Sequence, residues 1–531
     1  MTHAPLYLRN NVQVEPLFDQ WYAWSHLIPP TTAARNLTER HFKIMKSYIE
    51  EPAAHAAATH NPKMLGGPFM DYPTREVERI DALLQRTRRE RSHLIDLSFA
   101  IEELDSLLES EATGFSLQRV YPKVPAILRG YVELHYDLNN NPSFRFVEPL
   151  LYRTKYYDRS AQSLMLSLIS RDERAFVLST PRLPSDEATI LSIPYDHEIV
   201  DWLFRLKSEP HTWEEIATRL SAISDNPSFL PKLFSGTPPR PYCRYDGPGV
   251  RWRYFGHACI LIEAGGTSIL FDPVLSYTYE SNVSRYTYED LPPELDFVVI
   301  THDHQDHILF ETLLQIRHKV KTVVVPRSRN GALQDPSLKL ILENTGFLNV
   351  VELQEMETIK FEGGEITGLP FLGEHADLDI QSKLGYLVRV ASHTLLMLAD
   401  SCNVEPLLYE HLQMQLGNVD VVFLGMECDG APLSWLYGPL LTKRLDRAMD
   451  ASRRLSGSDF AQALEIVNVF SPEHVYVYAM GQEPWLNYVM SIKYTDESRP
   501  IVESNRLIEH CRTMGIVAER LFGEKDLYLR G

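Results

Sequence analysis

Seven consecutive residues, THDHQDH at positions 301–307, contain three histidines and two aspartates. They follow FVVI, an apolar run that predicts a buried strand. A strand that ends there would deliver a tight loop, on which four ligand-type side chains converge: His302, His304, Asp306 and His307. Imidazole suits zinc, iron, copper or nickel, and carboxylate is a harder donor that favours iron or manganese. The segment therefore predicts a metal site in which the first two histidines share one metal and the Asp-His pair turns toward a second.

HDHQDH after an apolar strand, with FGHACILIEAGGTSILFDP upstream, resembles the HxHxDH signature of the metallo-β-lactamase superfamily. The resemblance covers the chain from about Val250 onward. It implies an αββα sandwich with a two-metal site at one edge of the paired sheets. Members of this superfamily share the scaffold but not one reaction, so the fold alone leaves the function open.

The superfamily pattern calls for three later ligands. A bridging aspartate normally follows a strand, and LLMLADS supplies Asp400 in that setting. A carboxylate shared between two cations neutralises both and fixes their spacing at about 3.5–4 Å. The third ligand of the first metal should lie in FLGEHADLD, where Glu374 and His375 are adjacent. Adjacent residues at a strand end point in opposite directions, so only one of them is expected to bind.

The final ligand should be a histidine at the end of a strand in PEHVYVYAMG. Ala479 holds the aligned position, and His474 lies on the earlier side. Losing this histidine and replacing another by Glu374 raises the oxygen-donor character of the site and opens a coordination position. Such a site suits iron and dioxygen better than zinc and water.

These features, with a large mixed α and β half ahead of the lactamase-like half, resemble the diiron β-hydroxylases of chloramphenicol biosynthesis and nonribosomal peptide assembly. The length and the order of the halves also agree with that family. The resemblance implies a non-haem diiron monooxygenase of antibiotic biosynthesis with two iron ions in an oxo-bridged cluster and dioxygen as cosubstrate. The substrate would be an aminoacyl group, expected to be aromatic, held as a thioester on a carrier domain of a nonribosomal peptide synthetase. An external donor would supply two electrons.

Carried onto this sequence, the family pattern gives each ligand a place. One iron would be held by His302, His304 and Glu374, the other by Asp306 and His307, with Asp400 bridging them. Ala479 would leave the second iron a position for oxygen chemistry.

Other residues near these segments carry weaker signals. Glu427 follows the strand-like VDVVFLGM and is the candidate catalytic residue, as a labile carboxylate near the metals, or else an ordinary strand end. His257 is expected to support a ligand or pack in the core rather than bind metal. Four aromatic residues either line a substrate pocket or pack in the core: Trp435, Tyr437, Trp485 and Tyr488.

The elements that must position these residues divide the chain in two. SGTPPRPYCRYDGPG (235–249) is the most linker-like stretch, so we predict a mixed α+β N-terminal domain over 1–240 and a metallo-β-lactamase-like catalytic domain over 241–531. In the second domain a strand pair is expected around Gly265-Gly266. Helical stretches such as 310–319 alternate with strands such as 321–326, the pattern of an α/β layered fold.

The N-terminal domain discloses no chemistry of its own and is expected to dock a partner or form a homodimer. A helical pattern runs from Thr74 to Ser110, strands are expected at 131–138 and 174–180, and Thr212 with Glu215 predicts a capped helix. The basic cluster from Arg86 to Arg91 is either a solvated helix face or a dock for an acidic carrier.

Bulk properties limit the partners. The net charge is −19, from 71 acidic against 52 basic residues, which argues against nucleic acid or an anionic membrane surface. The five cysteines form no CxxC pair, no secretory signal is recognised, and no apolar stretch approaches the ~20 residues that span a bilayer. We therefore expect a cytoplasmic enzyme without structural disulfides.

Two other functions stay open from the residues alone. A dizinc hydrolase of a lactone, thioester or phosphodiester would use the same scaffold, and a binding protein could keep the fold without the chemistry. Metal content separates the three, because they predict two irons, two zincs and no metal.

Overall fold

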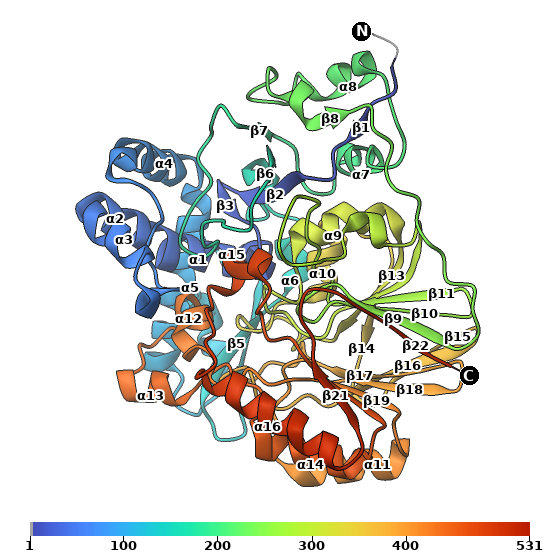
Figure 1. Cartoon of the computed structure of the whole chain (residues 1–531). Coiled ribbons are helices and arrows are strands. Elements are labelled where there is room, and N and C mark those ends of the chain that lie inside the picture. Colours follow the sequence, from blue (N-terminus) through green and yellow to red (C-terminus); the bar gives the residue numbers. More distant parts are fainter. Residues whose placement is uncertain (1–3, 531) are drawn as a thin grey trace.

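Two seven-stranded sheets form the centre of the C-terminal half in the computed structural model, which describes residues 4–530 (Figure 1). The first sheet runs, in spatial order, through β14 (Val350–Leu353), β13 (Val320–Pro326), β12 (Leu295–Val299), β11 (Thr267–Phe271), β10 (Ile260–Ala264), β9 (Val250–Tyr254) and β22 (Lys525–Leu529). The second runs through β15 (Thr358–Phe361), β16 (Gly364–Leu369), β17 (Gly385–Val390), β18 (His393–Met397), β19 (Val421–Gly425), β20 (His474–Tyr478) and β21 (Val517–Arg520).

The two sheets pack face to face through large side chains. The ring of Trp252 on β9 lies 5.1 Å from that of Phe423 on β19 and 4.8 Å from that of Tyr476 on β20, between ring centroids. Strands β11, β12 and β13 are parallel, as are β18, β19 and β20. Because parallel strands end at the same edge of a sheet, the loops that follow them gather at one end of the sandwich.

Helices cover both outer faces. The second sheet is covered by α11 (Pro406–Leu416), α14 (Phe460–Phe470) and α16 (Arg499–Thr513), and the first by α9 (Phe310–Ile316) and α10 (Leu338–Asn344) (Figure 1). This αββα sandwich behind a mixed N-terminal half confirms the predicted fold class. The expected turn at Gly265-Gly266 joins β10 to β11, and both glycines have positive φ, which favours glycine there.

The N-terminal half combines a small sheet with helices. Its sheet has the order β3 (Trp21–Tyr22), β2 (Val12–Phe18), β6 (Gln162–Leu168), β7 (Ala188–Leu191). Its longer helices are α1 (Pro30–Asn36), α2 (Phe42–Glu50), α3 (Pro52–Thr59), α4 (Val77–Glu90), α5 (Ser92–Glu111), α7 (Glu198–Arg205) and α8 (Trp213–Leu220). A separate hairpin pairs β4 (Val132–Tyr136) with β5 (Pro142–Phe146).

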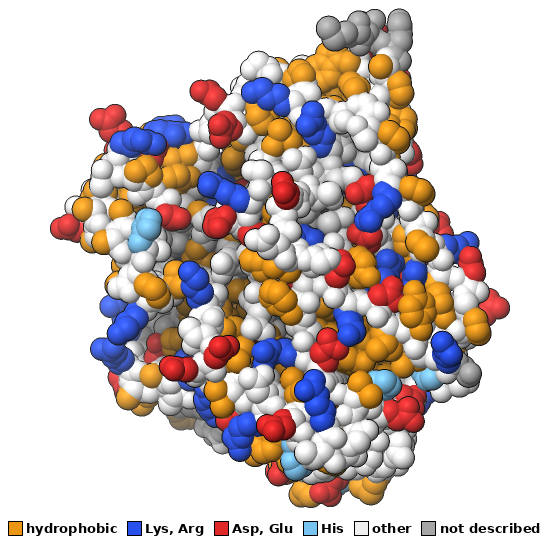
Figure 2. Space-filling model, in the orientation of Figure 1, with side chains coloured by type: hydrophobic (Ala, Val, Ile, Leu, Met, Phe, Trp, Pro, Cys, Tyr) orange, Lys and Arg blue, Asp and Glu red, His pale blue; other side chains and the backbone are white. Residues whose placement is uncertain are grey.

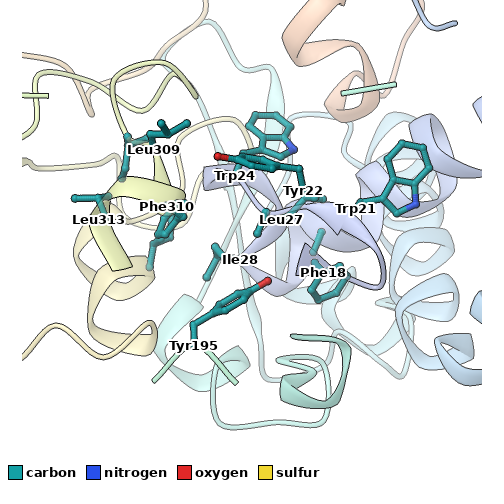
Figure 3. Packing of buried hydrophobic residues seen from close by; sticks show 14 of the residues in the cluster. Phe18, Trp21, Tyr22, Trp24, Leu27, Ile28, Tyr195, Leu309, Phe310 and Leu313 are labelled. Atoms are coloured by element: carbon teal, nitrogen blue, oxygen red, sulfur yellow. The ribbon is translucent and has the colours of Figure 1, made fainter. Parts of the chain in front are cut away.

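The two halves share one apolar core. Figure 3 shows side chains between Phe18 and Ile28 beside Leu309, Phe310 and Leu313, which lie at the start of α9, shortly after the histidine motif. The start of the chain therefore supports the helix behind the candidate site. The division at residue 240 stays a prediction, since this core crosses it.

Most of the local patterns predicted in the N-terminal half are confirmed, and one is wrong. The helical stretch from Thr74 forms α4 and α5, with a break at Arg91, and the Thr212–Glu215 capping box starts α8. The predicted strand over 174–180 is wrong, because this segment is irregular. Its polar groups bond elsewhere: Arg174 pairs with Glu15 and Glu311, so tertiary contacts override the local β-propensity.

The basic cluster of Arg86 to Arg91 is largely neutralised. Arg91 is buried and lies 2.9 Å from Asp158, and Arg86 lies 3.4 Å from Asp19. Arg88 is exposed, with its guanidinium over the ring of Phe42, and Arg89 lies beside Glu90. The segment is therefore not a continuous basic face.

No helix among the described residues combines the length and the apolar character that are needed to span a membrane.

A buried lysine at the end of α7 predicts a pH-dependent stability. Burial lowers the pKa of Lys207 to about 7, and its Nζ has no hydrogen-bond partner. Between pH 7 and 10.5 the unfolded chain holds this proton more tightly than the folded chain, so stability rises with pH. Replacing Lys207 by methionine should therefore stabilise the protein, and by about 3 kcal/mol more at pH 7 than at pH 10. Urea unfolding at both pH values measures this, and an equal gain at both would contradict it.

Candidate metal centre

The histidine motif forms a tight turn after β12. The backbone N–H of His307 donates to the carbonyl of His304 over 3.0 Å and closes this turn. Asp400 follows β18 in the second sheet, and Glu374 lies in the loop between β16 and β17. The structure brings all six predicted ligands together at the edge where the two sheets meet, and each is buried.

Five of the six form two groups that overlap at His302. The first group joins His302, His304 and Glu374, and the second joins His302, His307 and Asp400, with ligand atoms within 4.8 Å of one another in each. The sixth, Asp306, forms a group with His307 and His257. Asp400 Oδ2 lies 3.1 Å from His307 Nε2 and 3.9 Å from His302 Nε2. Asp400 therefore stands between the two halves of the cluster, where a bridging carboxylate would.

Residues behind the cluster fix which nitrogen of each ring faces inward. Asp272 Oδ2 accepts from the Thr301 hydroxyl over 2.6 Å and lies 2.8 Å from His307 Nδ1. The Thr301 oxygen, having given its proton to Asp272, accepts from His302 Nδ1 over 3.0 Å. His302 Nε2 and His307 Nε2 are thereby left as acceptors that face the carboxylates, the arrangement that metal-binding histidines require.

Three buried atoms of the predicted ligands also have no partner. His302 Nε2, Glu374 Oε2 and Asp400 Oδ1 form no hydrogen bond, although buried polar atoms are nearly always satisfied. Cations at this place would satisfy all three. The donor set of three imidazoles and three carboxylates fits iron, since both donor types are ones that iron accepts.

Glu374 and His375 differ in what they face. Glu374 Oε2 lies 2.9 Å from His304 Nδ1 and 4.0 Å from His302 Nε2, and the residue lines the cavity above the cluster. The ring of His375 stacks on that of His304 at 4.4 Å, and its Nε2 lies 3.6 Å from Asp303. Burial raises the pKa of Glu374 to about 7 against the opposing effect of His304, and a bound cation would favour its charged form.

His375 also belongs to a group with Asp303 and His304 whose ligand atoms lie close together. The carboxylate of Asp303 is already engaged, since its Oδ2 lies 3.1 Å from His26 Nε2 of the N-terminal half. His26 and Asp303 therefore hold the back of the motif in place.

His257 lies closer to the cluster than the sequence indicates. Its Nε2 is 2.9 Å from Asp306 Oδ2 and 3.2 Å from His307 Nε2. The N–H of Gly481 donates to its Nδ1 over 3.2 Å, so the ring proton is on Nε2 and is directed at Asp306. This tautomer makes His257 a hydrogen-bond donor that orients Asp306, in line with the supporting role expected for it.

Strand β20 shows which residue occupies the position of the missing histidine. Ala479 follows the carboxyl end of the strand and lines the cavity, whereas His474 begins the strand. Five strand residues span about 16 Å, so His474 lies at the far end and does not replace the lost ligand. A methyl group stands where the superfamily places an imidazole.

A cavity of about 590 Å³ opens onto the cluster from between the two halves of the chain. Residues of the 63–66 loop form one wall, and α12 (Leu433–Tyr437) and the segment after α15 (Asn487–Met490) form others. Trp435 lines it, and Tyr437 instead contacts His304 Nε2 over 2.9 Å. Trp485 and Tyr488 are buried core residues outside its lining.

Glu427 borders this cavity beside Asp400 and Glu374. The hydroxyl of Tyr494 donates to Glu427 Oε1 over 3.1 Å. Burial of the carboxyl group raises the pKa of Glu427 to about 8, with further increases from Asp400 and Asp429. Glu427 can therefore hold a proton at neutral pH at the wall of the cavity.

Known proteins match nearly the whole length of the chain. Residues 7–238 match the family described as the diiron non-heme beta-hydroxylase N-terminal domain, and residues 267–475 match the beta-lactamase superfamily domain. The 4-amino-L-phenylalanyl-[CmlP-peptidyl-carrier-protein] 3-hydroxylase of Streptomyces venezuelae is 41% identical over 98% of this chain and 99% of its own. The chain belongs to the diiron β-hydroxylase family.

Structures agree with this membership. The crystal structure of CmlA, a diiron β-hydroxylase from Streptomyces venezuelae, matches this hydroxylase with a TM-score of 0.93 and 40% identity, over 99% of this chain and 100% of that one. By contrast, a UPF0173 protein of Pyrococcus abyssi is 29% identical over only 25% of this hydroxylase and 53% of its own chain. Full-length similarity is therefore to the oxygenase and not to this partial relative.

Three supporting residues of the hydroxylase were not predicted from the sequence. Asp272 directly follows β11 and lies at the same sheet edge as the motif. Tyr437 and His26 approach the motif from segments far away in the chain, and no local signal marks them. The strand-end position of Asp272 is a signal that could have identified it.

Proposed function

We propose that this enzyme hydroxylates the β-carbon of an aminoacyl group, aromatic in kind, that is held as a thioester on a carrier domain of a nonribosomal peptide synthetase. The observation that carries the proposal is the 41% identity over nearly the whole chain to a 3-hydroxylase that acts on an aminoacyl carrier protein. The alternative function, a dizinc hydrolase, has less support, because it rests on the lactamase-like half alone.

The ligand assignment is part of the same proposal. One iron would be held by His302 Nε2, His304 Nδ1 and Glu374, and the other by Asp306 and His307 Nε2, with Asp400 bridging. It is supported by the inward-facing nitrogens and by the three unsatisfied atoms of the cluster. Bound iron would supply the activation of dioxygen, with electrons from an external donor.

The chain's own side chains would position the substrate and manage protons. The cavity leads to the carboxylates past Trp435, which offers a surface for an aromatic ring. Glu427, with Tyr494 hydrogen-bonded to its Oε1, would hold a proton at the cavity wall for transfer during the reaction. The overall reaction inserts one oxygen atom of dioxygen into a C–H bond. The second oxygen atom is reduced by two electrons, takes up two protons and leaves as water.

Labelled dioxygen tests the proposal. With the aminoacyl carrier as substrate, the product should gain one labelled oxygen atom, and each turnover should consume one dioxygen and two electrons. The purified enzyme should hold two irons per chain. Oxygen from water in the product, or thioester hydrolysis without oxygen uptake by a protein with two zincs, would favour the hydrolase instead. The homodimer, the electron donor and the 1–240 docking domain stay predictions.

A further inference from the structure

The two ends of the cavity differ in net charge. The exposed charged residues that line its outer end are one acidic residue, Asp429, and four basic ones: Lys63, Arg454, Lys493 and Arg499. Its inner end is lined by the carboxylates of Asp306, Glu374, Asp400 and Glu427. A ligand that spans the cavity is therefore favoured if its anionic group lies at the outer end.

Two of the four basic residues have no acidic partner. Arg454 lies 3.4 Å from Asp429, and Arg499 lies 3.3 Å from Asp459. Within residues 4–530, neither Lys63 nor Lys493 forms an ion pair. On the face drawn in Figure 2, acidic and basic side chains are interspersed.

The segments that carry the two lysines lie beside each other. Lys63 lies three residues before Gly66, whose carbonyl accepts from Trp435 Nε1 over 2.9 Å. Gly66 has φ +72°, which favours glycine, and a Cβ there would lie 3.6 Å from the Cβ of Ser491. Lys493 lies two residues after Ser491 and lines the same cavity. The N-terminal half thus supplies one cation, and the catalytic half the other.

We infer that Lys63 and Lys493 bind the phosphodiester of the carrier domain's phosphopantetheine arm, an inference that rests on the proposed function. A carrier domain presents its aminoacyl group as a thioester at the end of this arm, whose other end is a phosphodiester. The arm therefore carries its anion remote from the reacting carbon, which matches the cavity's charge distribution. Ammonium groups bind phosphate oxygens through charge-assisted hydrogen bonds.

Calorimetry with free phosphopantetheine and with pantetheine, which lacks the phosphate, tests the inference without turnover. The wild type should bind the phosphorylated compound about tenfold more tightly, as two exposed ion pairs allow. The double variant Lys63→Ala/Lys493→Ala should bind both equally. Lys46→Ala removes an exposed lysine of α2 outside the cavity and should keep the wild-type preference. Equal binding of both compounds by the wild type would overturn the inference.

Turnover kinetics distinguish binding of the arm from binding of the carrier's protein surface. The double variant should raise KM about tenfold for both the aminoacyl phosphopantetheine thioester and the carrier-bound substrate, and leave KM for the pantetheine thioester unchanged. If it weakened only the carrier-bound substrate, the lysines would meet the carrier protein and the inference would be wrong. If the wild type hydroxylated none of the three, the proposed function would fail, while the calorimetry would still decide the phosphate site.

Discussion

Replacing Glu374 by alanine is expected to lower turnover by more than about 100-fold and to reduce the bound metal below two ions per chain. Glu374 faces the cavity and lies 2.9 Å from His304 Nδ1, so its loss removes an oxygen donor from the first metal position. Metal analysis of the purified variant and oxygen uptake with the carrier-bound substrate measure both effects.

His375→Ala is the matched control, because it alters the adjacent residue and the same loop. His375 stacks on His304 but does not line the cavity, so this variant should keep two metal ions and lose turnover by less than about tenfold. The assignment is wrong if His375→Ala strips the metal while Glu374→Ala retains a full complement. That result would restore a histidine-rich site and favour the hydrolase.

The free amino acid is expected to be a very poor substrate, with kcat/KM more than about 1,000-fold below that of the same residue on its carrier. A reactive oxygen species must form only when substrate is in place, or it is lost in side reactions. Binding energy from the remote carrier and its arm can organise the site, so truncated substrates should lose kcat and not only affinity.

Steady-state kinetics on a substrate series measure this effect: the free amino acid, the pantetheine thioester, the phosphopantetheine thioester and the carrier-bound residue. We expect kcat to rise along the series, and electron consumption without product to fall. Equal kcat for the free amino acid and the carrier-bound residue would contradict control by the carrier. That result would not contradict the assignment of the enzyme as an oxygenase.

The ligands were predictable because their signal is local. HDHQDH and Asp400 each follow an apolar strand, and parallel strands of a layered fold end at one edge. Residues almost 100 positions apart could therefore be placed together without knowing the intervening chain. Glu374 was predictable only through the resemblance to the hydroxylase family, since its irregular loop has no periodicity to interpret.

The surroundings of the site were not predictable from local patterns. His26, Lys63 and Tyr437 reach the motif or its cavity through packing between the two halves, which one sequence does not encode in any short segment. The strand expected over 174–180 failed for the same reason. Arg174 bonds Glu15 and Glu311 across the shared core, and this tertiary pairing outweighs the β-propensity of its neighbours.

The placement of β22 beside β9 bears on how the chain is made. Tyr254 of β9 pairs with Lys525 of β22, 271 residues later. At about 5–20 residues per second, a ribosome needs roughly 15–50 s to deliver the partner strand. For that time the edge of β9 stands uncovered, and its unpaired backbone groups can pair with another nascent chain. The yield of active enzyme in a host cell should therefore depend on chaperone supply and growth temperature more than on the stability of the finished fold.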